Sequence, residues 1–167
     1  FCGTDKTERD VFARLLYGFR IAMTFSLGYL ILTYLIAICI GSIMGYFGGK
    51  TDILGLRLVE IWANVPFLYM VIILVSVMPS WWGIGWRVSS LLIIMVLFSW
   101  TGMTYYIRAA VYKEKARDYV SAAKVIGASS SRIIFRHLLP NVISTLVTFA
   151  PFTIAAAVSS ITALDFL

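Results

Sequence analysis

Charged side chains are scarce in this sequence, and their scarcity excludes several classes of protein. Only 13% of the 167 residues are Asp, Glu, Lys or Arg, whereas 60% are hydrophobic and the mean hydropathy is +0.90. Soluble proteins carry about 25% charged residues. A soluble globular, disordered or coiled-coil chain is therefore excluded, and a membrane domain is indicated.

Histidine and cysteine are scarcer still. His137 is the single histidine, so a zinc motif that needs two histidines is excluded. Cys2 and Cys39 are too few for a disulfide framework or a metal-ligand cluster. No constellation of nucleophile and base accompanies them. The sequence therefore predicts no catalytic residue, no metal site and no bound cofactor.

Four long stretches of the sequence contain no Asp, Glu, Lys, Arg or His. These stretches hold 102 of the 167 residues, at 21–49, 61–86, 88–107 and 138–164. A helix needs about 20 apolar residues to cross a hydrocarbon core of about 30 Å. We therefore predict an all-α integral membrane fold, a single transmembrane domain over residues 1–167, with four spans at about 21–48, 61–79, 88–107 and 138–164.

Positive charge gathers between the third and fourth predicted spans. Residues 108–137 carry 7 of the 14 Lys and Arg residues. Basic loops stay on the cytoplasmic side of a membrane, so this segment is expected in the cytoplasm, together with residues 50–60, and both chain ends outside. No stacking platform or groove-reading motif accompanies the basic residues, so nucleic-acid binding is not predicted.

The same basic segment carries the signals of two helices joined by a glycine. Residues 108–126 contain no Pro or Gly and favour helix. Gly127 follows, where a helix end with positive φ is expected, and Ser129 offers an N-cap for a second helix. Pro140 marks the first turn of the last span. Two capped helices predict a rigid knob for a cytoplasmic partner; the alternative is an amphipathic segment lying on the membrane surface.

Polar residues within the charge-free stretches are candidates for a transport pathway. In a membrane helix such residues either hold helices together or line a wet cavity, and both interpretations remain open here. The candidates are Asn64 in the second span, Ser144, Thr148 and Ser159 near one face of the last, and similarly Ser99 and Thr104.

Two glycines of the first span, Gly41 and Gly45, are four residues apart. This spacing of small residues is typical of close contact between membrane helices.

A signature in the basic segment resembles a known family. Ser121-Ala122-Ala123, three residues, Gly127, nine residues and His137-Leu138-Leu139-Pro140 are similar to the EAA loop of binding-protein-dependent ABC importer permeases. That loop reads E-A-A, three residues, G, nine residues and I-x-L-P, so Ser121 replaces Glu and His137 replaces Ile. The peptide and nickel branch often has His there, followed by L-P-N, and Asn141 is present.

Four other stretches agree with that branch. They are Gly3-Thr4-Asp5 with Arg9-Asp10-Val11, Arg14 to Gly18, Gly45 to Gly49 with Asp52, and Leu164 to Leu167. Residues 14–20 and 162–167 together are most similar to the second permease of microcin-C-type peptide importers. Glu8 departs from the pattern, which usually has a small residue there.

The resemblance implies a type I importer permease of about six spans, so the first and last would lie outside this sequence. It implies a bacterial inner-membrane location, a second permease subunit, two cytoplasmic ATP-binding subunits, an extracytoplasmic solute-binding protein, a peptide substrate and surrounding lipid. The permease itself would not be an enzyme. The residues implied in coupling to the ATPase are Ser121, Ala122, Ala123, Gly127, Ser129, Arg132, His137 and Pro140.

The residues themselves support an external energy source, because ion-coupled carriers place acidic, basic or histidine side chains in the membrane and the predicted spans contain none of these. The alternative is a non-transport membrane scaffold or an ion-conducting pore subunit. Its basic loop would bind lipid headgroups, at about 1 kcal/mol per basic residue.

Overall fold

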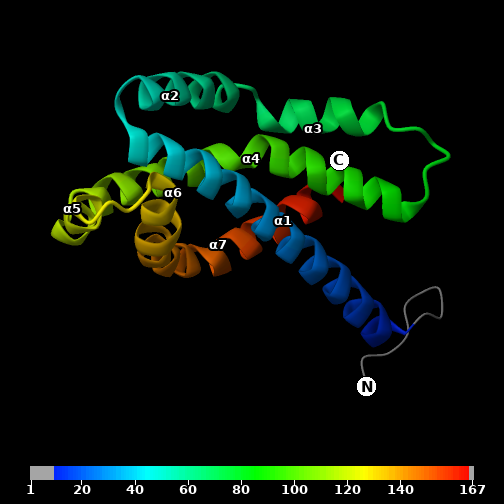
Figure 1. Cartoon of the computed structure of the whole chain (residues 1–167). Helices are drawn as coiled ribbons and strands as arrows, with labels where there is room; N and C mark the ends of the chain where they lie inside the picture. Colours follow the sequence, from blue (N-terminus) through cyan, green and yellow to red (C-terminus); the bar gives the residue numbers. More distant parts are fainter. Residues whose placement is uncertain (1–9, 166–167) are drawn as a thin grey trace.

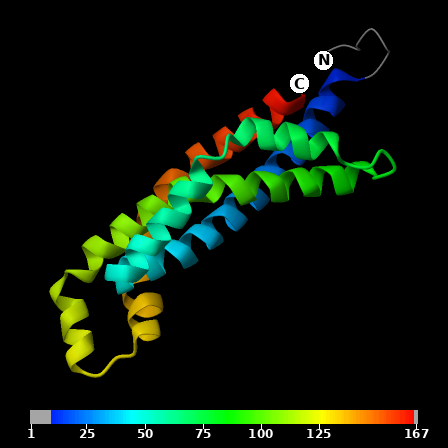
Figure 2. The same cartoon turned by 90° about the horizontal axis from the view of Figure 1, so that it is seen from above.

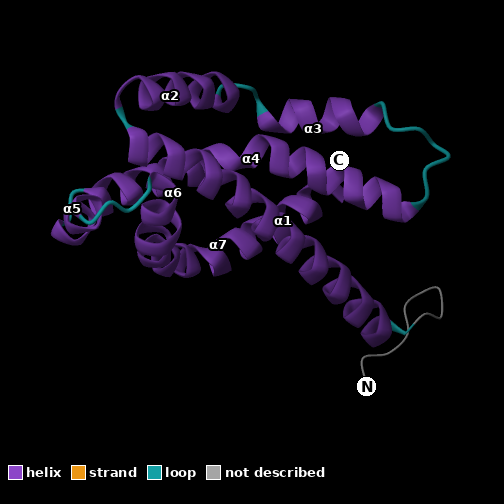
Figure 3. Cartoon of the chain, viewed as in Figure 1, coloured by secondary structure: helices purple, strands orange, loops and turns teal. Residues whose placement is uncertain are grey.

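The computed structural model describes residues 10–165 and places them in helices joined by short turns, with no strand among them (Figures 1 and 3). Cys2, Glu8, the Gly3-Thr4-Asp5 stretch and the final two residues lie outside the described part. The elements are α1 (Val11–Phe47), α2 (Gly49–Ala63), α3 (Phe67–Ser76), α4 (Ile84–Lys115), α5 (Asp118–Val125), α6 (Ser130–Arg132), the π-helical turn η1 (Ile133–Leu138) and α7 (Leu139–Asp165).

Three helices are each long and apolar enough to cross a membrane: α1, α4 and the continuous run Ser130–Ala163. The pair α2 and α3 passes the same test only when taken together, and its two halves are bent by 62°. The all-α membrane fold is thus confirmed. The span predicted at 61–79 corresponds to the end of α2 and to α3, and residues 50–60, placed between two predicted spans, are helical.

A proline explains the break between α2 and α3. Pro66 has no amide hydrogen to donate, and its ring disfavours helical geometry at Val65. Accordingly α2 ends with Asn64 at its C-cap and α3 begins just after Pro66. Trp62 holds the pair against α4, because its Nε1 donates to the Leu97 carbonyl at 2.7 Å and its ring stacks on Phe98.

Helices α1 and α4 run in the same direction and pack closely through glycines. A Cβ atom at Gly41 would lie 2.9 Å from the Thr104 carbonyl oxygen, and one at Gly45 would lie 2.7 Å from that of Arg108. Distances under about 3 Å leave no room for a side chain. The close helix contact predicted from the spacing of these two glycines is therefore confirmed.

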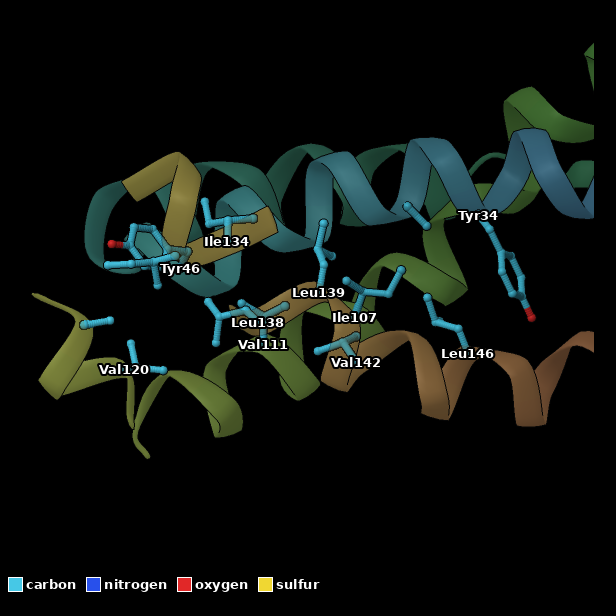
Figure 4. Close-up of a cluster of buried hydrophobic side chains, with 13 residues drawn as sticks. Tyr34, Tyr46, Ile107, Val111, Val120, Ile134, Leu138, Leu139, Val142 and Leu146 are labelled. Carbon is cyan, nitrogen blue, oxygen red and sulfur yellow. The ribbon is translucent and has the colours of Figure 1, made fainter. Parts of the chain in front are cut away.

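The main buried cluster lies where α1, α4, η1 and α7 meet. Figure 4 shows Ile107, Leu138 and Val142 pointing toward one another between the ribbons, and all three are buried. Val120 of α5 belongs to the same cluster. In Figure 2, α5 lies at one end of the bundle, and the start of α1 and the end of α7 lie at the other. The core thus supports the end that carries the basic segment.

Candidate functional site

The basic segment 108–137 does not form the single helix expected up to Ile126. Helix α4 ends at Lys115, and α5 begins at Asp118 after a turn at Ala116 and Arg117. The turn folds α5 back so that Val120 is fully buried in the core cluster. A straight continuation of α4 would leave this apolar side chain in water, so burial outweighs the local preference for an unbroken helix.

Gly127 ends α5 as predicted. Its φ is +81°, which is a left-handed conformation that L-residues rarely adopt. The Gly127 amide donates to the Lys124 carbonyl and the Ala128 amide to the Ala123 carbonyl, each at 3.0 Å. This pair of bonds is the Schellman arrangement, which satisfies the last carbonyls of a helix. The connection after α5 is therefore a defined turn.

Ser129 caps the next helix, also as predicted. Its Oγ accepts a hydrogen bond from the Arg132 amide at 3.4 Å. The helix then runs from Ser130 into α7 through the π-helical turn η1, in which the Leu139 amide donates to the Ile134 carbonyl, five residues back. Pro140 lies in the first turn of α7 and has no amide to donate. The wider turn just before Pro140 is a π-bulge, a feature often found at functional sites.

The turn between α5 and α6 presents apolar side chains to the outside. Val125 is 89% exposed and Ile126 is 85% exposed, and Ser121 and Lys124 of the same helix are exposed as well. Val120 and Ala123, on the opposite face, are buried. We call residues 121–132 the tip. The tip comprises the end of α5, a capped turn and α6. Ala123 on one face packs against the core, and Val125 and Ile126 on the other face are exposed.

Two sets of polar contacts, one made by Tyr119 and one by Tyr46, fix α5 and the tip to the neighbouring helices. The Tyr119 hydroxyl donates to Glu114 at 2.9 Å and accepts from the Asn141 side chain at 3.1 Å. Burial raises the pKa of Tyr119, so the phenol stays protonated and can donate at neutral pH. Asn141 also donates to the His137 carbonyl at 3.0 Å. These bonds link α4, α5, η1 and α7 in one network.

Tyr46 at the end of α1 makes the second contact. Its hydroxyl donates to the Ser130 Oγ at 3.4 Å, and the ammonium groups of Lys115 and Lys124 lie 5.6 and 5.8 Å from its ring centre. Cations at this distance are attracted to the face of an aromatic ring. The position of the tip is therefore tied to α1 as well as to α4.

An ion pair that the sequence analysis missed lies beside this region, outside the predicted spans. Arg108 of α4 donates two hydrogen bonds to the Asp52 carboxylate of α2. The bonds from Arg108 hold the pKa of Asp52 below its ordinary value. Arg108 directly follows a charge-free stretch and Asp52 lies three residues after another, but no local pattern connects residues 56 positions apart.

The structure places the eight predicted coupling residues around the tip and its base. Ala123 is buried in the core, whereas most of the others are exposed, and His137 is half-buried in η1. They lie along α5, the turn after it, α6, η1 and the start of α7. The exposed group is Ser121, Ala122, Gly127, Ser129, Arg132 and Pro140.

The four predicted pathway residues lie on two elements, Asn64 at the end of α2 and the other three on α7. Ser144, Thr148 and Ser159 each donate a hydrogen bond to a carbonyl of their own helix, and Asn64 does the same at the end of α2. All four are exposed in the chain as described. Their hydroxyl and amide groups are thus satisfied locally, and nothing in the described residues joins Asn64 to the last span.

A different polar group surrounds a cavity of about 280 Å³ between α1, α4 and α7. We call it the mid-span pocket. Its hydroxyl groups come from Tyr29, Thr33, Tyr34, Ser99 and Thr153, and the rest of its wall from Met103, Phe149, Phe152 and Ala156. Ser99 was among the residues similar to the pathway candidates; the others were missed, because hydroxyl residues on three helices share no spacing in the sequence.

One bond closes an edge of the mid-span pocket. The Tyr34 hydroxyl and the Thr153 Oγ1 are 2.9 Å apart, which connects α1 to α7. Thr33 Oγ1, in contrast, is buried and has no hydrogen-bond partner among the described residues. An unsatisfied buried hydroxyl costs about 1–3 kcal/mol. Tyr29, whose side chain lies next to those of Thr33 and Ser99, supplies the neighbouring hydroxyl.

The sequence matches a described family and several characterised transport proteins. The family is the binding-protein-dependent transport system inner membrane component, which matches residues 37–167. The chain is 43% identical, over 99% of its length, to a peptidoglycan transport system permease protein, YejE, of Agrobacterium fabrum. It is 39% identical, over 99% of its length, to the inner membrane ABC transporter permease protein YejE of Escherichia coli.

A third relative is the dipeptide transport system permease protein DppC of Bacillus subtilis, 33% identical over 99% of this chain. The chain covers 42%, 47% and 50% of these three relatives. It thus spans about half the length of the curated relatives it matches.

Proposed function

This chain belongs to the family of binding-protein-dependent transport system inner membrane components, and from this premise we propose that it is the central part of a transmembrane subunit of an ATP-driven peptide importer. Two relatives support a peptide substrate: the name of the Bacillus subtilis relative specifies dipeptide transport, and that of the Agrobacterium fabrum relative specifies transport of peptidoglycan, whose glycan strands carry short peptides. The finer assignment, the second permease of a microcin-C-type importer, is part of the proposal and rests on residues 14–20 and 162–167.

The tip is the proposed contact with a cytoplasmic ATP-binding subunit. The observation that carries this proposal is the exposure of Val125 and Ile126 at the end of a helix whose other face is buried. Exposed apolar side chains on a rigid support are typical of protein interfaces. The basic residues around them suit the cytoplasmic side of a membrane.

The path for energy follows from the anchoring contacts. A displacement of the tip by the ATP-binding subunit would be passed to α4 through Tyr119 and Glu114, to α7 through Asn141, and to α1 through Tyr46 and Ser130. Those three helices are also the ones that surround the mid-span pocket. Movement of the tip is therefore connected to the walls of a membrane cavity.

The remaining partners are proposed on the same basis. A second permease would complete the pathway, a solute-binding protein would deliver the peptide from the outer side, and the ATP-binding subunits would hydrolyse ATP, so that this chain is not itself an enzyme. The lipid-binding scaffold or pore subunit is not favoured, because the relatives are transport permeases.

Disulfide crosslinking tests the proposed contact in the assembled full-length transporter. Cys2 and Cys39 are replaced by serine, and the variant Ile126→Cys is combined with single cysteines on the ATP-binding subunit. We expect crosslinks from position 126 and none from the matched control Val147→Cys. Val147 is also an exposed apolar residue, but it lies in the middle of α7. Absence of crosslinks from position 126 in a transporter that still imports peptide would contradict the proposal.

A further inference from the structure

Helix α4 provides a scale of depth in the membrane. Its stretch without Asp, Glu, Lys, Arg or His, 88–107, is bounded by Arg87 and Arg108. At 1.5 Å per residue these two arginines lie about 31 Å apart along the helix, which matches a hydrocarbon core of about 30 Å. Arg108 therefore marks the inner edge of that core, on the side of the tip, and Leu97 lies about halfway across it.

Two contacts place α2 on this scale. The Asp52 carboxylate accepts from Arg108 at the inner edge, and the Trp62 Nε1 donates to the Leu97 carbonyl halfway across. Helix α2 thus runs antiparallel to α4 from the inner edge to the middle of the core. Residues 53–60, which the charge pattern alone assigns to the cytoplasmic side, are placed within the membrane by these contacts.

The depth of α2 gives its second ion pair a new meaning. The Arg57 Nη1 donates to a Glu60 carboxylate oxygen at 3.0 Å, and both side chains are exposed. Counted from Asp52, Arg57 lies about 7 Å and Glu60 about 12 Å inside the inner edge. The guanidinium does not extend back to the headgroups, because it bonds to the deeper residue of the two. Charges at this depth face protein or enclosed water, since lipid does not solvate them.

The side chains around the ion pair decide between protein and water. Four aliphatic side chains on the outward side of α2 are 61–68% exposed, namely Ile53, Leu54, Leu58 and Ile61. Val59, on the opposite side, is buried. At about 100° per residue, Ile53 projects between Glu60 and Arg57, so no line divides this side into a polar and an apolar half. Lipid would not solvate the charges, and water would leave the aliphatic groups wet. Another protein surface suits both.

The spacing and charge of this side indicate what kind of protein surface fits it. Lys50, Ile53, Arg57, Glu60 and Asn64 alternate at intervals of three and four residues, which is the spacing of side chains that pack against a second helix. Two of the five are cationic and one is anionic, and Arg57 uses one of its five N–H donors on Glu60. A helix with an acidic side chain opposite Arg57 would therefore complement it.

We propose that this outward side of α2 is a subunit interface within the membrane, on which a helix of the second permease packs and offers an acidic side chain to Arg57. Figure 1 shows α2 and α3 along one side of the bundle and α7 along the other, so a second subunit can approach α2 without displacing a described helix. The inference rests on the proposed function, which requires a second permease, and it names the surface and chemistry of that contact.

Photocrosslinking tests what covers α2. The probe p-benzoylphenylalanine replaces Ile61 in the assembled full-length transporter in liposomes, and adducts are identified by mass. We expect adducts with the second permease. The matched control replaces Tyr106, an exposed aromatic residue that contacts Phe149 of α7 on the other side of the bundle, and it should give none. Adducts from position 61 only with lipid, or only with another part of the same chain, would overturn the inference.

Thiol labelling tests the alternative of enclosed water. In the assembled transporter with Cys2 and Cys39 replaced by serine, Glu60→Cys is exposed to a charged, membrane-impermeant methanethiosulfonate reagent on the inner side. The second permease should shield position 60, so labelling should be at least about tenfold slower than in the separated permease in detergent, where the side chain is exposed. Equal labelling rates would show a wet surface and would overturn the inference.

A charge substitution separates the interface from the fold. Arg57→Met leaves carboxylates unpaired in a contact without water, so it should weaken association of the two permeases at least about tenfold, measured by energy transfer between labelled subunits in liposomes. Arg57→Lys keeps the charge and should weaken it less. Thermal unfolding of the separated permease should not respond to either substitution, because the pair is exposed there.

The control for this substitution is Arg87→Met, which removes the same charge at the outer end of α4; it should change association by less than about twofold. Equal association of Arg57→Met and wild type would overturn the inference. A wild-type transporter whose permeases associate but which imports no peptide would contradict the proposed function instead.

Discussion

At the residue scale, the Asp52–Arg108 ion pair connects the start of α2 to α4. Both side chains are largely shielded, with 14% and 28% exposed, whereas Glu60 and Arg57 of the neighbouring pair are 47% and 75% exposed. Asp52→Asn should lower the free energy of unfolding by about 1–2 kcal/mol, because a shielded guanidinium loses its charged partner. Glu60→Gln, the matched control, should change it by less than about 0.5 kcal/mol. Thermal unfolding of the full-length protein in detergent measures both.

The same pair predicts a dependence on pH. Arg108 lowers the pKa of Asp52 in the folded state, so the pair stabilises the fold fully above the ordinary carboxyl pKa of about 4. Its contribution should disappear as the pH falls through the depressed folded value. The stability difference between wild type and Asp52→Asn should therefore be constant near neutral pH and shrink in acid. A difference that grew in acid would contradict this account.

Gly45 fixes the distance between α1 and α4. Gly45→Ala would place a methyl group 2.7 Å from the Arg108 carbonyl oxygen, and overpacking of this kind costs about 1–3 kcal/mol. Gly18→Ala is the matched control, because nothing lies within 4 Å of its Cβ; it should be neutral or stabilise the helix by up to about 1 kcal/mol. Equal effects of the two substitutions on thermal unfolding would refute the close contact.

At the scale of elements, Gly127 defines how the tip turns. Gly127→Ala meets no neighbouring atom within 4 Å, so its effect comes from the backbone, whose φ of +81° is strained for alanine by about 1 kcal/mol or more. We expect normal membrane insertion and a clear loss of peptide uptake relative to ATP hydrolysis. Gly102→Ala, also without close neighbours and in helical geometry, should keep the wild-type ratio. Uptake assays and ATP hydrolysis in the same vesicles give that ratio.

The elements also show what the sequence could predict and why. The end of α5 at Gly127 and the cap at Ser129 were predictable, because each depends on the chemistry of a few neighbouring residues. The turn after Lys115 was not, because its cause is the burial of Val120 against distant helices. The break at Pro66 carried a local signal, but the apolar run around it concealed it.

At the scale of the whole molecule, the helices that anchor the tip are the helices that line the mid-span pocket. The sequence predicted the tip residues because they form one continuous segment. It did not predict the pocket, whose hydroxyl groups meet only when α1, α4 and α7 pack. The predicted pathway residues Ser144, Thr148 and Ser159 each bond to a carbonyl of their own helix, as Thr153 of the pocket does, so their place in a pathway stays a prediction.

The central claim is that this chain helps to carry peptide across the membrane with energy from a partner ATPase. The most direct measurement is uptake of a labelled tripeptide into proteoliposomes that contain the full-length permease, its partner permease, the ATP-binding subunits and the solute-binding protein. The account predicts uptake that requires ATP and is lost when Val125 and Ile126 are both replaced by aspartate, with membrane insertion unchanged. Uptake that continues without ATP, or in the doubly substituted transporter, would contradict it.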